Sequence, residues 1–258
     1  PFYIMKSNGG VFSPDQAAKQ SVEMALSGPA AGARGAAHIG KLAGIENIVT
    51  IDMGGTSADV TLIRDGQPSV TIDGEIGPYP LSIPIVDIHT IGAGGGSIAT
   101  VTEQGGLVVG PRSAGADPGP ACYDKGGVLP TVTDANLALG RIPPHLLDGE
   151  IEIVTDLAID AIRKHIAEPL GIDVIDAALG ILAIVNNNMV GALKVVSVER
   201  GLDPRQFTLS AFGGAGPVHG GDLAKLFGTR RLMIPRHPGI LCAIVLLATD
   251  LQYDFVRT

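Results

Sequence analysis

The stretch Ile51-Asp-Met-Gly-Gly-Thr-Ser-Ala-Asp-Val60 decides the fold that we expect. An apolar run at residues 47–52 predicts a strand that ends at two glycines, and residues 59–63 predict a second strand directly after them. Glycines at a strand end let backbone N–H groups approach phosphate oxygens with no Cβ in the way. The alternative is a glycine-rich β-turn with incidental acidic residues.

The expected phosphate-binding residues of this loop are Gly54, Gly55, Thr56 and Ser57. Asp52 supplies hard oxygen ligands for Mg²⁺ or for its waters. Asp59 is a catalytic candidate that would orient the metal or the nucleophile.

The element after the loop separates this stretch from other nucleotide-binding motifs. In Rossmann and P-loop folds the glycine loop opens a helix, whereas here it opens a strand that continues into a hairpin at Asp65-Gly66, with residues 69–72 as the expected partner strand. A phosphate loop inside a β-hairpin is the arrangement of the actin, Hsp70 and hexokinase superfamily. We therefore predict an α/β fold of the actin-like ATPase (ribonuclease H-like) type with a Gly/Pro-rich insertion.

A second glycine motif lies at residues 207–219, where a predicted strand, a glycine turn and a helix follow one another. A dinucleotide site is the alternative, but the glycines are spaced G-x-G-x-x-x-G, and no Asp or Glu occurs between Asp222 and Asp250. Gly213, Gly214 and Gly216 are instead expected to border an adenosine. His219 beside this turn is interpreted as structural.

Composition narrows the classes of function. The chain has 258 residues, of which 45% are hydrophobic and 17% charged, so it is globular. The net charge of −8 argues against nucleic acid as a partner.

Two further features bear on location. Cys122 and Cys242 predict free thiols in the cytoplasm. The apolar run at residues 239–248 is too short to cross a membrane and is expected in the core. The first residue, Pro1, suggests that residues 1–258 are one domain of a longer chain.

Residues 74–150 are dense in Gly and Pro and are predicted to form a loop-rich insertion, with a hairpin across residues 103–106. His89 precedes a run of glycines and is a catalytic candidate that would relay a proton or hold a carbonyl. Asp134 is the third catalytic candidate, although a helix-capping role is the favoured alternative.

Helices are expected at residues 14–26 with Ser13 as N-cap, 30–42, 155–168 and 174–198. Asn186–Asn188 in the last of these are either satisfied core groups or face a cleft.

These motifs together resemble the central domain of the hydantoinase A / 5-oxoprolinase family, which includes subunits of ATP-dependent acetone and acetophenone carboxylases. The matching stretches are SGPAAG (27–32), DMGGTSADV (52–60), GAGGGSIA (92–99), GPRSAGADPGPACY (110–123), TVTDANLALGR (131–141), ERGLDPRQFTLSAFGGAGPVHG (199–220) and TDLQYDFVRT (249–258). One departure is Leu241-Cys-Ala-Ile-Val245, where members usually carry a Ser-Ala and a Gly; we expect it to touch no phosphate-loop residue. A second is that only one Asp-x-Gly-Gly-Thr loop occurs, whereas the family has another in an upstream domain.

The resemblance implies an ATP-dependent amidohydrolase that opens a cyclic amide such as a hydantoin or 5-oxoproline, with ATP and Mg²⁺ as cofactors. Its implied partners are the upstream domain with the other phosphate loop and a hydantoinase B-type subunit or domain. The alternatives are a subunit of a ketone carboxylase and a non-catalytic nucleotide-sensing domain.

Overall fold

The core of the protein is a six-stranded mixed sheet. The computed structural model describes residues 2–76, 79–146 and 149–247. The sheet has the order β10-β4-β3-β15-β16, with β5 paired to β4. Its strands are β3 (Ile48–Met53), β4 (Ala58–Arg64), β5 (Gln67–Pro68), β10 (Ile88–Ile91), β15 (Thr208–Phe212) and β16 (Arg231–Met233). The strands β3, β4 and β10 are antiparallel, and β15 and β16 continue the sheet in parallel with β3. This is the ribonuclease H-like order, and it confirms the predicted actin-like fold.

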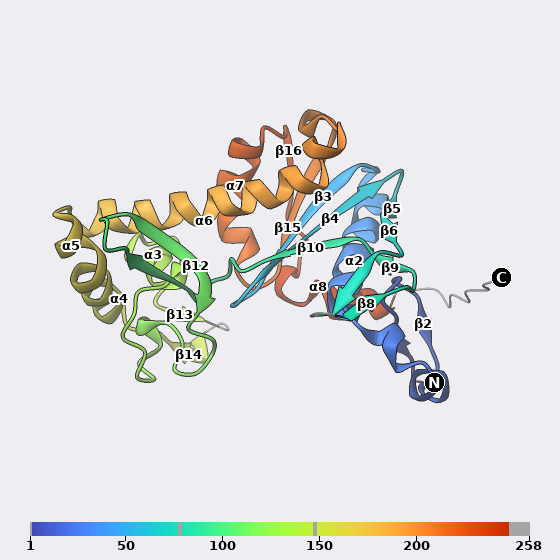
Figure 1. Ribbon diagram of the computed structural model, residues 1–258, viewed down its shortest axis with the longest axis horizontal. Coiled ribbons are helices and arrows are strands. Elements are labelled where there is room, and N and C mark those ends of the chain that lie inside the picture. Colours follow the sequence, from blue (N-terminus) through green and yellow to red (C-terminus); the bar gives the residue numbers. More distant parts are fainter. Residues whose placement is uncertain (1, 77–78, 147–148, 248–258) are drawn as a thin grey trace.

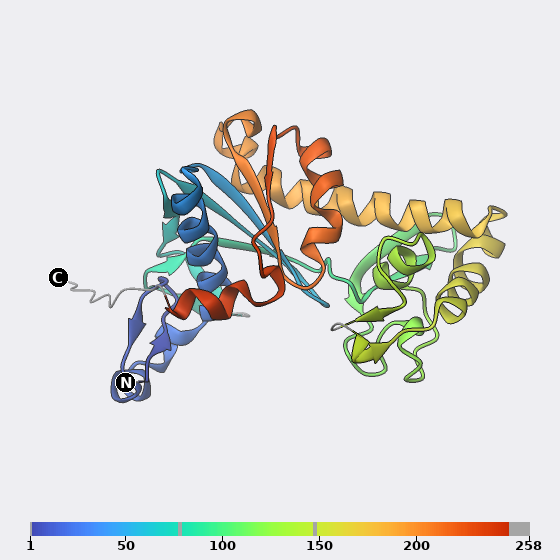
Figure 2. The same ribbon diagram turned by 180° about the vertical axis from the view of Figure 1, so that it is seen from behind.

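Helices cover both faces of the sheet. Figure 2 shows α2 (Ser27–Ala43) in front of the strands and α6 (Val174–Val196) behind them. Successive residues of β3 alternate between these faces: Ile51 is buried in the main core with α6, and Ile48 packs with α2. Small residues let α2 approach the sheet, since a Cβ on Gly40 would lie 2.4 Å from Cδ1 of Ile48.

A separate lobe lies beside the N-terminal half of α6 (Figure 1). It contains β11 (Ser97–Val101), β12 (Leu107–Ser113), α3 (Val132–Ala138), β13 (His145–Leu146), β14 (Ile151–Glu152), α4 (Thr155–Ile162), a π-helical turn (Arg163–Ala167) and α5 (Glu168–Leu170). The hairpin predicted across residues 103–106 is confirmed by the pairing of β11 with β12. Because β10 belongs to the core sheet, we propose that the insertion begins after β10 rather than at Gly74.

Two local predictions differ from the structure. The helix expected at 14–26 ends early, as α1 (Pro14–Lys19) and a 3-10 turn (Ser21–Met24), although Ser13 is the N-cap as predicted. Of the strand expected at 69–72, only Ser69 bonds to β4, through its N–H to the carbonyl oxygen of Leu62 over 2.9 Å. The two-residue turn at Asp65-Gly66 places Gln67 directly opposite Arg64, so the partner of β4 is β5, and β6 (Val70–Thr71) pairs with β9 (Ile85–Val86) instead.

The remaining elements are β1 (Ile4–Met5), β2 (Val11–Phe12), β7 (Gly74–Ile76), β8 (Tyr79–Leu81), α7 (Gly216–Phe227), α8 (Leu241–Ile244) and 3-10 turns at Ala121–Tyr123, Val198–Arg200, Pro204–Gln206, Pro238–Ile240 and Val245–Leu247. The expected core run at 239–248 is only partly buried: Leu241 is in the core, whereas Leu247 is 90% exposed and residue 248 lies outside the described residues. The stretch at 249–258 also lies outside them. Among the described helices, Val174–Arg200 is long and apolar enough to cross a membrane, and half of its apolar window is buried inside the protein.

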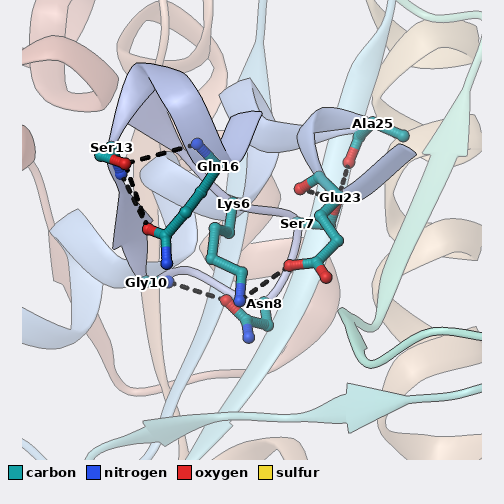
Figure 3. A network of polar contacts seen from close by, with 8 residues as sticks. All are labelled: Lys6, Ser7, Asn8, Gly10, Ser13, Gln16, Glu23 and Ala25. Carbon is teal, nitrogen blue, oxygen red and sulfur yellow. Dashed lines mark hydrogen bonds and ion pairs between the residues drawn. The ribbon is translucent and has the colours of Figure 1, made fainter. Parts of the chain in front are cut away.

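A buried polar turn anchors the N-terminal hairpin (Figure 3). The ammonium of Lys6 lies 2.8 Å from Oε2 of Glu23, and Oγ of Ser7 donates to the carbonyl oxygen of Glu23 over 2.7 Å. The N–H of Val86 in β9 donates to the carbonyl oxygen of Ser7 over 2.8 Å. The first two contacts attach the N-terminal hairpin to the 3-10 turn at Ser21–Met24, and the third attaches it to β9. A cavity of about 310 Å³ lies beside them.

Candidate functional site

The two glycine motifs meet at one edge of the sheet although 160 residues separate them. The strands β3 and β15 run in parallel with Asp52 opposite Phe212, so both motifs follow the carboxyl ends of neighbouring strands. A Cβ on Gly213 would lie 2.4 Å from Oδ1 of Asp52, and the φ of Gly213 is +81°. Only glycine is compatible with this close approach. The N–H of Ala215 donates to the carbonyl oxygen of Met53 over 2.9 Å, which fixes the second turn against the first.

The loop between β3 and β4 presents backbone donors to solvent. The carbonyl oxygens of Gly54 and Gly55 accept hydrogen bonds from the N–H groups of Gly95 and Gly96, over 3.0 and 2.6 Å. Within the described ranges, the N–H groups of Gly55, Thr56 and Ser57 donate to no other residue. A Cβ on Gly55 would meet nothing within 4 Å, so chain packing does not require glycine there. An open surface with several unused donors is what a phosphate group needs.

A third glycine run, at residues 94–96, supports this loop from behind. A Cβ on Gly94 would lie 2.6 Å from the backbone of Gly55 and Thr56. The carbonyl oxygen of Gly95 accepts hydrogen bonds from N–H and Oγ1 of Thr133 in α3, over 2.8 and 2.9 Å. The role of this run as a support was missed from the sequence; the signal was three consecutive glycines followed by the predicted strand of a hairpin.

Asp52 and Asp59 form a cross-strand pair beside the loop. They are directly opposite in the β3–β4 register, so their side chains share the face of the sheet that α2 covers. Oγ1 of Thr90 in β10 donates to Oδ1 of Asp59 over 2.5 Å. Burial raises the pKa of both carboxyl groups, and the charge of Asp59 adds to the rise for Asp52, while the hydrogen bonds to each partly oppose it.

Two neighbouring, partly desolvated carboxylates favour a bound cation, because a positive charge relieves their repulsion. Across the described ranges, no group of three or more His, Cys, Asp or Glu side chains is arranged to hold a metal ion. Asp52 and Asp59 therefore fit Mg²⁺ only as an ion that keeps several waters and takes further oxygens from a phosphate ligand, which is the usual coordination of Mg²⁺ beside nucleotides.

Cys242 corrects one expectation from the sequence. The segment 241–245 was expected to touch no phosphate-loop residue, yet Sγ of Cys242 donates to Oδ2 of Asp52 over 3.4 Å. The contact arises because α8 packs on α2, where a Cβ on Gly32 would lie 3.1 Å from Sγ of Cys242. Burial, followed by the charge of Asp52, raises the pKa of the Cys242 thiol to about 12.

The other two catalytic candidates lie elsewhere. Asp134 is fully buried, and its carboxylate accepts hydrogen bonds from the backbone of Ala121, Cys122 and Thr131 and from the hydroxyl of Thr131. It belongs to the capping box of α3, so the capping interpretation is confirmed. His89 pairs with Val60 and therefore lies on the opposite face of the sheet from Asp59. The structure does not bring either residue to Asp52.

His219 belongs to a buried polar network that joins α7 to α3 and α6. Its Nδ1 lies 2.7 Å from Oδ1 of Asn186, and its Nε2 lies 3.2 Å from Nδ2 of Asn136. Burial, and secondarily the charge of Arg141, lowers the pKa of His219 to about 4, so the ring is neutral. Asn186 is thus a satisfied core group, whereas Asn188 is exposed.

Comparison with known proteins identifies the family. Residues 1–255 match the Hydantoinase/oxoprolinase family. The chain belongs to this family. The resemblance inferred from the motifs is therefore confirmed.

Similar members of the Hydantoinase/oxoprolinase family include a caprolactamase subunit and an acetophenone carboxylase subunit. The chain is 46% identical to caprolactamase subunit alpha of Pseudomonas jessenii over its whole length, which covers 37% of that protein. It is 41% identical to the acetophenone carboxylase gamma subunit of Aromatoleum aromaticum over 90% of its length, or 32% of that subunit.

Two solved structures have the same fold as this member of the Hydantoinase/oxoprolinase family. The ATP-dependent caprolactamase of Pseudomonas jessenii superposes with a TM-score of 0.87 over 98% of the chain. The nucleotide-free acetone carboxylase superposes with a TM-score of 0.87 over 98% of the chain, at 31% identity. The chain spans 37% and 36% of these structures, and several relatives are subunits of larger enzymes.

Proposed function

We propose that the whole protein uses ATP to activate a cyclic amide for hydrolysis. The phosphates of ATP would lie on the unused N–H groups of Gly55, Thr56 and Ser57, and the adenosine would lie along Gly213–Gly216. The single observation that carries this proposal is the meeting of that donor-rich loop with the Asp52–Asp59 pair and the second glycine turn at one edge of the sheet.

The chemistry follows from the poor reactivity of an amide. The nitrogen of an unactivated cyclic amide is a poor leaving group, so water attacks its carbonyl carbon slowly. Attack of the carbonyl oxygen on the γ-phosphorus of ATP releases ADP and forms an imidoyl phosphate. Water then adds to its carbon, and the ring C–N bond breaks as the nitrogen takes up a proton, which leaves an acyl phosphate. A second water hydrolyses the acyl phosphate, so phosphate leaves as inorganic phosphate and the open-chain amino acid remains.

The residues of this chain would contribute by position and charge rather than by covalent chemistry. Backbone donors on a fixed loop stabilise the charge that develops on the transferring phosphoryl group. Asp52 and Asp59 would hold Mg²⁺, which supplies neutralisation of the phosphate charge. Thr90 and Cys242 fix the orientation of these carboxylates through their hydrogen bonds.

A ketone carboxylase is the second candidate, since the acetone and acetophenone carboxylases share the fold and family. The same site would then phosphorylate a ketone oxygen or bicarbonate. We prefer the amide because the identity to the caprolactamase subunit, 46%, exceeds the 41% and 31% to the carboxylases. A non-catalytic sensor is disfavoured because a sensor has no need of two desolvated carboxylates, which weaken folding.

The experiment is steady-state ATP turnover by the whole protein in the presence of hydantoin, 5-oxoproline, caprolactam, acetone or acetophenone, the ketones with bicarbonate. We expect one cyclic amide to raise the rate at least tenfold. Stimulation by a ketone alone would identify the carboxylase, and no response to any compound would favour the sensor.

We propose partners on two grounds: the chain spans only part of the length of its relatives, and it has a single phosphate loop. Because the chain spans about a third of its relatives, we propose that a further part of the whole protein supplies the other Asp-x-Gly-Gly-Thr loop and closes the cleft over ATP. A hydantoinase B-type subunit or domain would complete the enzyme. Both cysteines are free thiols, which agrees with the cytoplasmic location that we propose.

A further inference from the structure

A cavity of about 360 Å³ opens in the second lobe, between the end of β12 and the loop at residues 114–129. Arg112 and Asp117 contribute charged side chains to its lining, and Ser113 adds a hydroxyl. Ile98, Val128 and Leu129 supply an apolar wall. The volume lies within the range of small-molecule sites, which is roughly 300–1,000 Å³.

Gly96 connects this cavity to the candidate phosphate loop. The N–H of Gly96 donates to the carbonyl oxygen of Gly55 over 2.6 Å, and its own carbonyl oxygen accepts from the N–H of Ala114 over 2.8 Å. A Cβ on Gly96 would lie 3.0 Å from Oγ of Ser113. Since Ser113 and Ala114 line the cavity, one residue separates its wall from the phosphate loop.

The adenosine turn contacts the start of the same loop, and a Cβ on Gly95 would lie 3.9 Å from Cβ of Ala215. Ala215 donates to Met53 at the end of β3, whereas Gly96 and Ser113 follow Gly55 toward the second lobe. Figure 1 shows the tip of the β3–β4 hairpin pointing toward that lobe. A nucleotide that runs from the turn at Gly213–Gly216 across the loop would therefore direct its terminal phosphate toward the cavity.

The lining matches the hydrogen-bonding edge of a cyclic amide. An amide in a small ring is cis, so its N–H donor and its carbonyl acceptor lie side by side on one edge. The guanidinium of Arg112 only donates and the carboxylate of Asp117 only accepts, which together complement that edge. The ring methylenes would contact the apolar wall formed by Ile98, Val128 and Leu129.

We propose that this cavity is the acceptor site of the enzyme, in which Arg112 and Asp117 recognise the cis amide and place its carbonyl oxygen beside the terminal phosphate. The proposal rests on the proposed ATP-dependent amide hydrolysis. The proposal implies that the enzyme distinguishes a lactam from a lactone of the same ring size. The lactone lacks the N–H group from which Asp117 would accept a hydrogen bond, so the enzyme disfavours it.

The test compares charge-removing variants of the whole protein inside and outside the cavity. Arg112→Gln and Asp117→Asn remove the recognition pair, while Lys125→Gln and Asp124→Asn remove the same charges from exposed positions of the same loop that do not line the cavity. The KM for the cyclic amide and the KM for ATP are measured separately, with thermal melting as a check on folding. Val128→Trp, at an exposed position of the cavity wall, provides a variant that blocks the cavity without touching either charge.

We expect the cyclic-amide KM to rise at least tenfold in Arg112→Gln, Asp117→Asn and Val128→Trp, with the ATP KM and both controls within twofold of the wild type. Asp117→Asn should also narrow the preference for the lactam over the lactone. An unchanged cyclic-amide KM in these variants, or equal changes in both KM values, would overturn the proposal while leaving the proposed function intact. A wild type that no cyclic amide stimulates would overturn the proposed function and this proposal with it.

Discussion

The thiol of Cys242 donates a hydrogen bond to the carboxylate of Asp52 over 3.4 Å, which joins α8 to the end of β3 at the candidate site. Because burial and the charge of Asp52 raise the thiol pKa to about 12, Cys242 is neutral at pH 7.5 and should react slowly with iodoacetamide. Asp52→Asn removes the charge, so it should speed alkylation of Cys242 severalfold, measured by mass spectrometry of the intact protein under native conditions. Equal rates in wild type and variant would show that the two groups are not electrostatically coupled.

Asp52→Asn should also lower ATP turnover while it raises the stability of the fold. We expect ATP turnover by the whole protein to fall more than about 100-fold, the usual size of effect for a group that stabilises the transition state. The raised pKa of Asp52 means that its ionised form opposes folding at neutral pH, so the variant should be more stable than the wild type. Turnover and thermal melting are the measurements. Asp65→Asn, an exposed acid at the β4–β5 turn, is the matched control and should change neither.

His219 predicts a pH dependence of stability. Its pKa falls from 6.5 to about 4 on folding, so below pH 6.5 the unfolded chain takes up a proton that the folded protein resists. The contribution of neutral His219 to the free energy of unfolding should therefore be fully present above pH 6.5. It should fall by roughly 3 kcal/mol between pH 6.5 and 4. Urea unfolding, followed by hydrogen exchange of α6 and α7, measures the decline.

His219→Gln should flatten this decline between pH 6.5 and 4, because the substituted side chain does not titrate. His38→Gln, at an exposed position of α2, is the control and should leave it unchanged. The same slope in wild type and His219→Gln would exclude the buried histidine as its source.

Local signals predicted the centre of the site and little of its surroundings. The β3–loop–β4 hairpin follows from apolar runs and glycines that are adjacent in sequence. The strands β3 and β4 lie where the sequence predicted them. By contrast, β10 is an edge strand whose partner precedes it by about 30 residues, inside a stretch whose Gly and Pro content indicated loops. Its pairing is a tertiary contact that no local pattern encodes.

The roles of single side chains depended on burial that the sequence does not show. Asp134 was placed correctly at the start of a helix, but the backbone donors of Ala121 and Cys122 that occupy its carboxylate come from a separate turn. Cys242 reaches Asp52 across 190 residues because small residues of α2 admit α8. His89 was grouped with the glycine run by proximity in sequence, yet strand alternation places it on the other face of the sheet.

Residues 1–258 alone should fold without catalysing ATP hydrolysis. The chain has one Asp-x-Gly-Gly-Thr loop, and we propose that the other belongs to a further part of the whole protein. This chain alone would then leave the phosphates in water, where electrostatic stabilisation is weak. Steady-state hydrolysis by this chain, measured beside the whole protein with Mg²⁺ and a stimulating amide, should not exceed background. A rate comparable to that of the whole protein would mean that the second loop is not needed.

The most direct test of the central claim is the affinity of the whole protein for Mg-ATP, measured by calorimetry in Gly55→Val. A side chain at Gly55 enters open space, so the fold should tolerate it, but it would occupy the position that the phosphates need. Gly191→Val, at an exposed position of α6 where a Cβ also meets nothing, is the matched control. We predict that Gly55→Val loses at least tenfold in affinity while Gly191→Val binds as the wild type does. Unchanged affinity in a folded Gly55→Val protein would contradict the placement of the nucleotide on this loop.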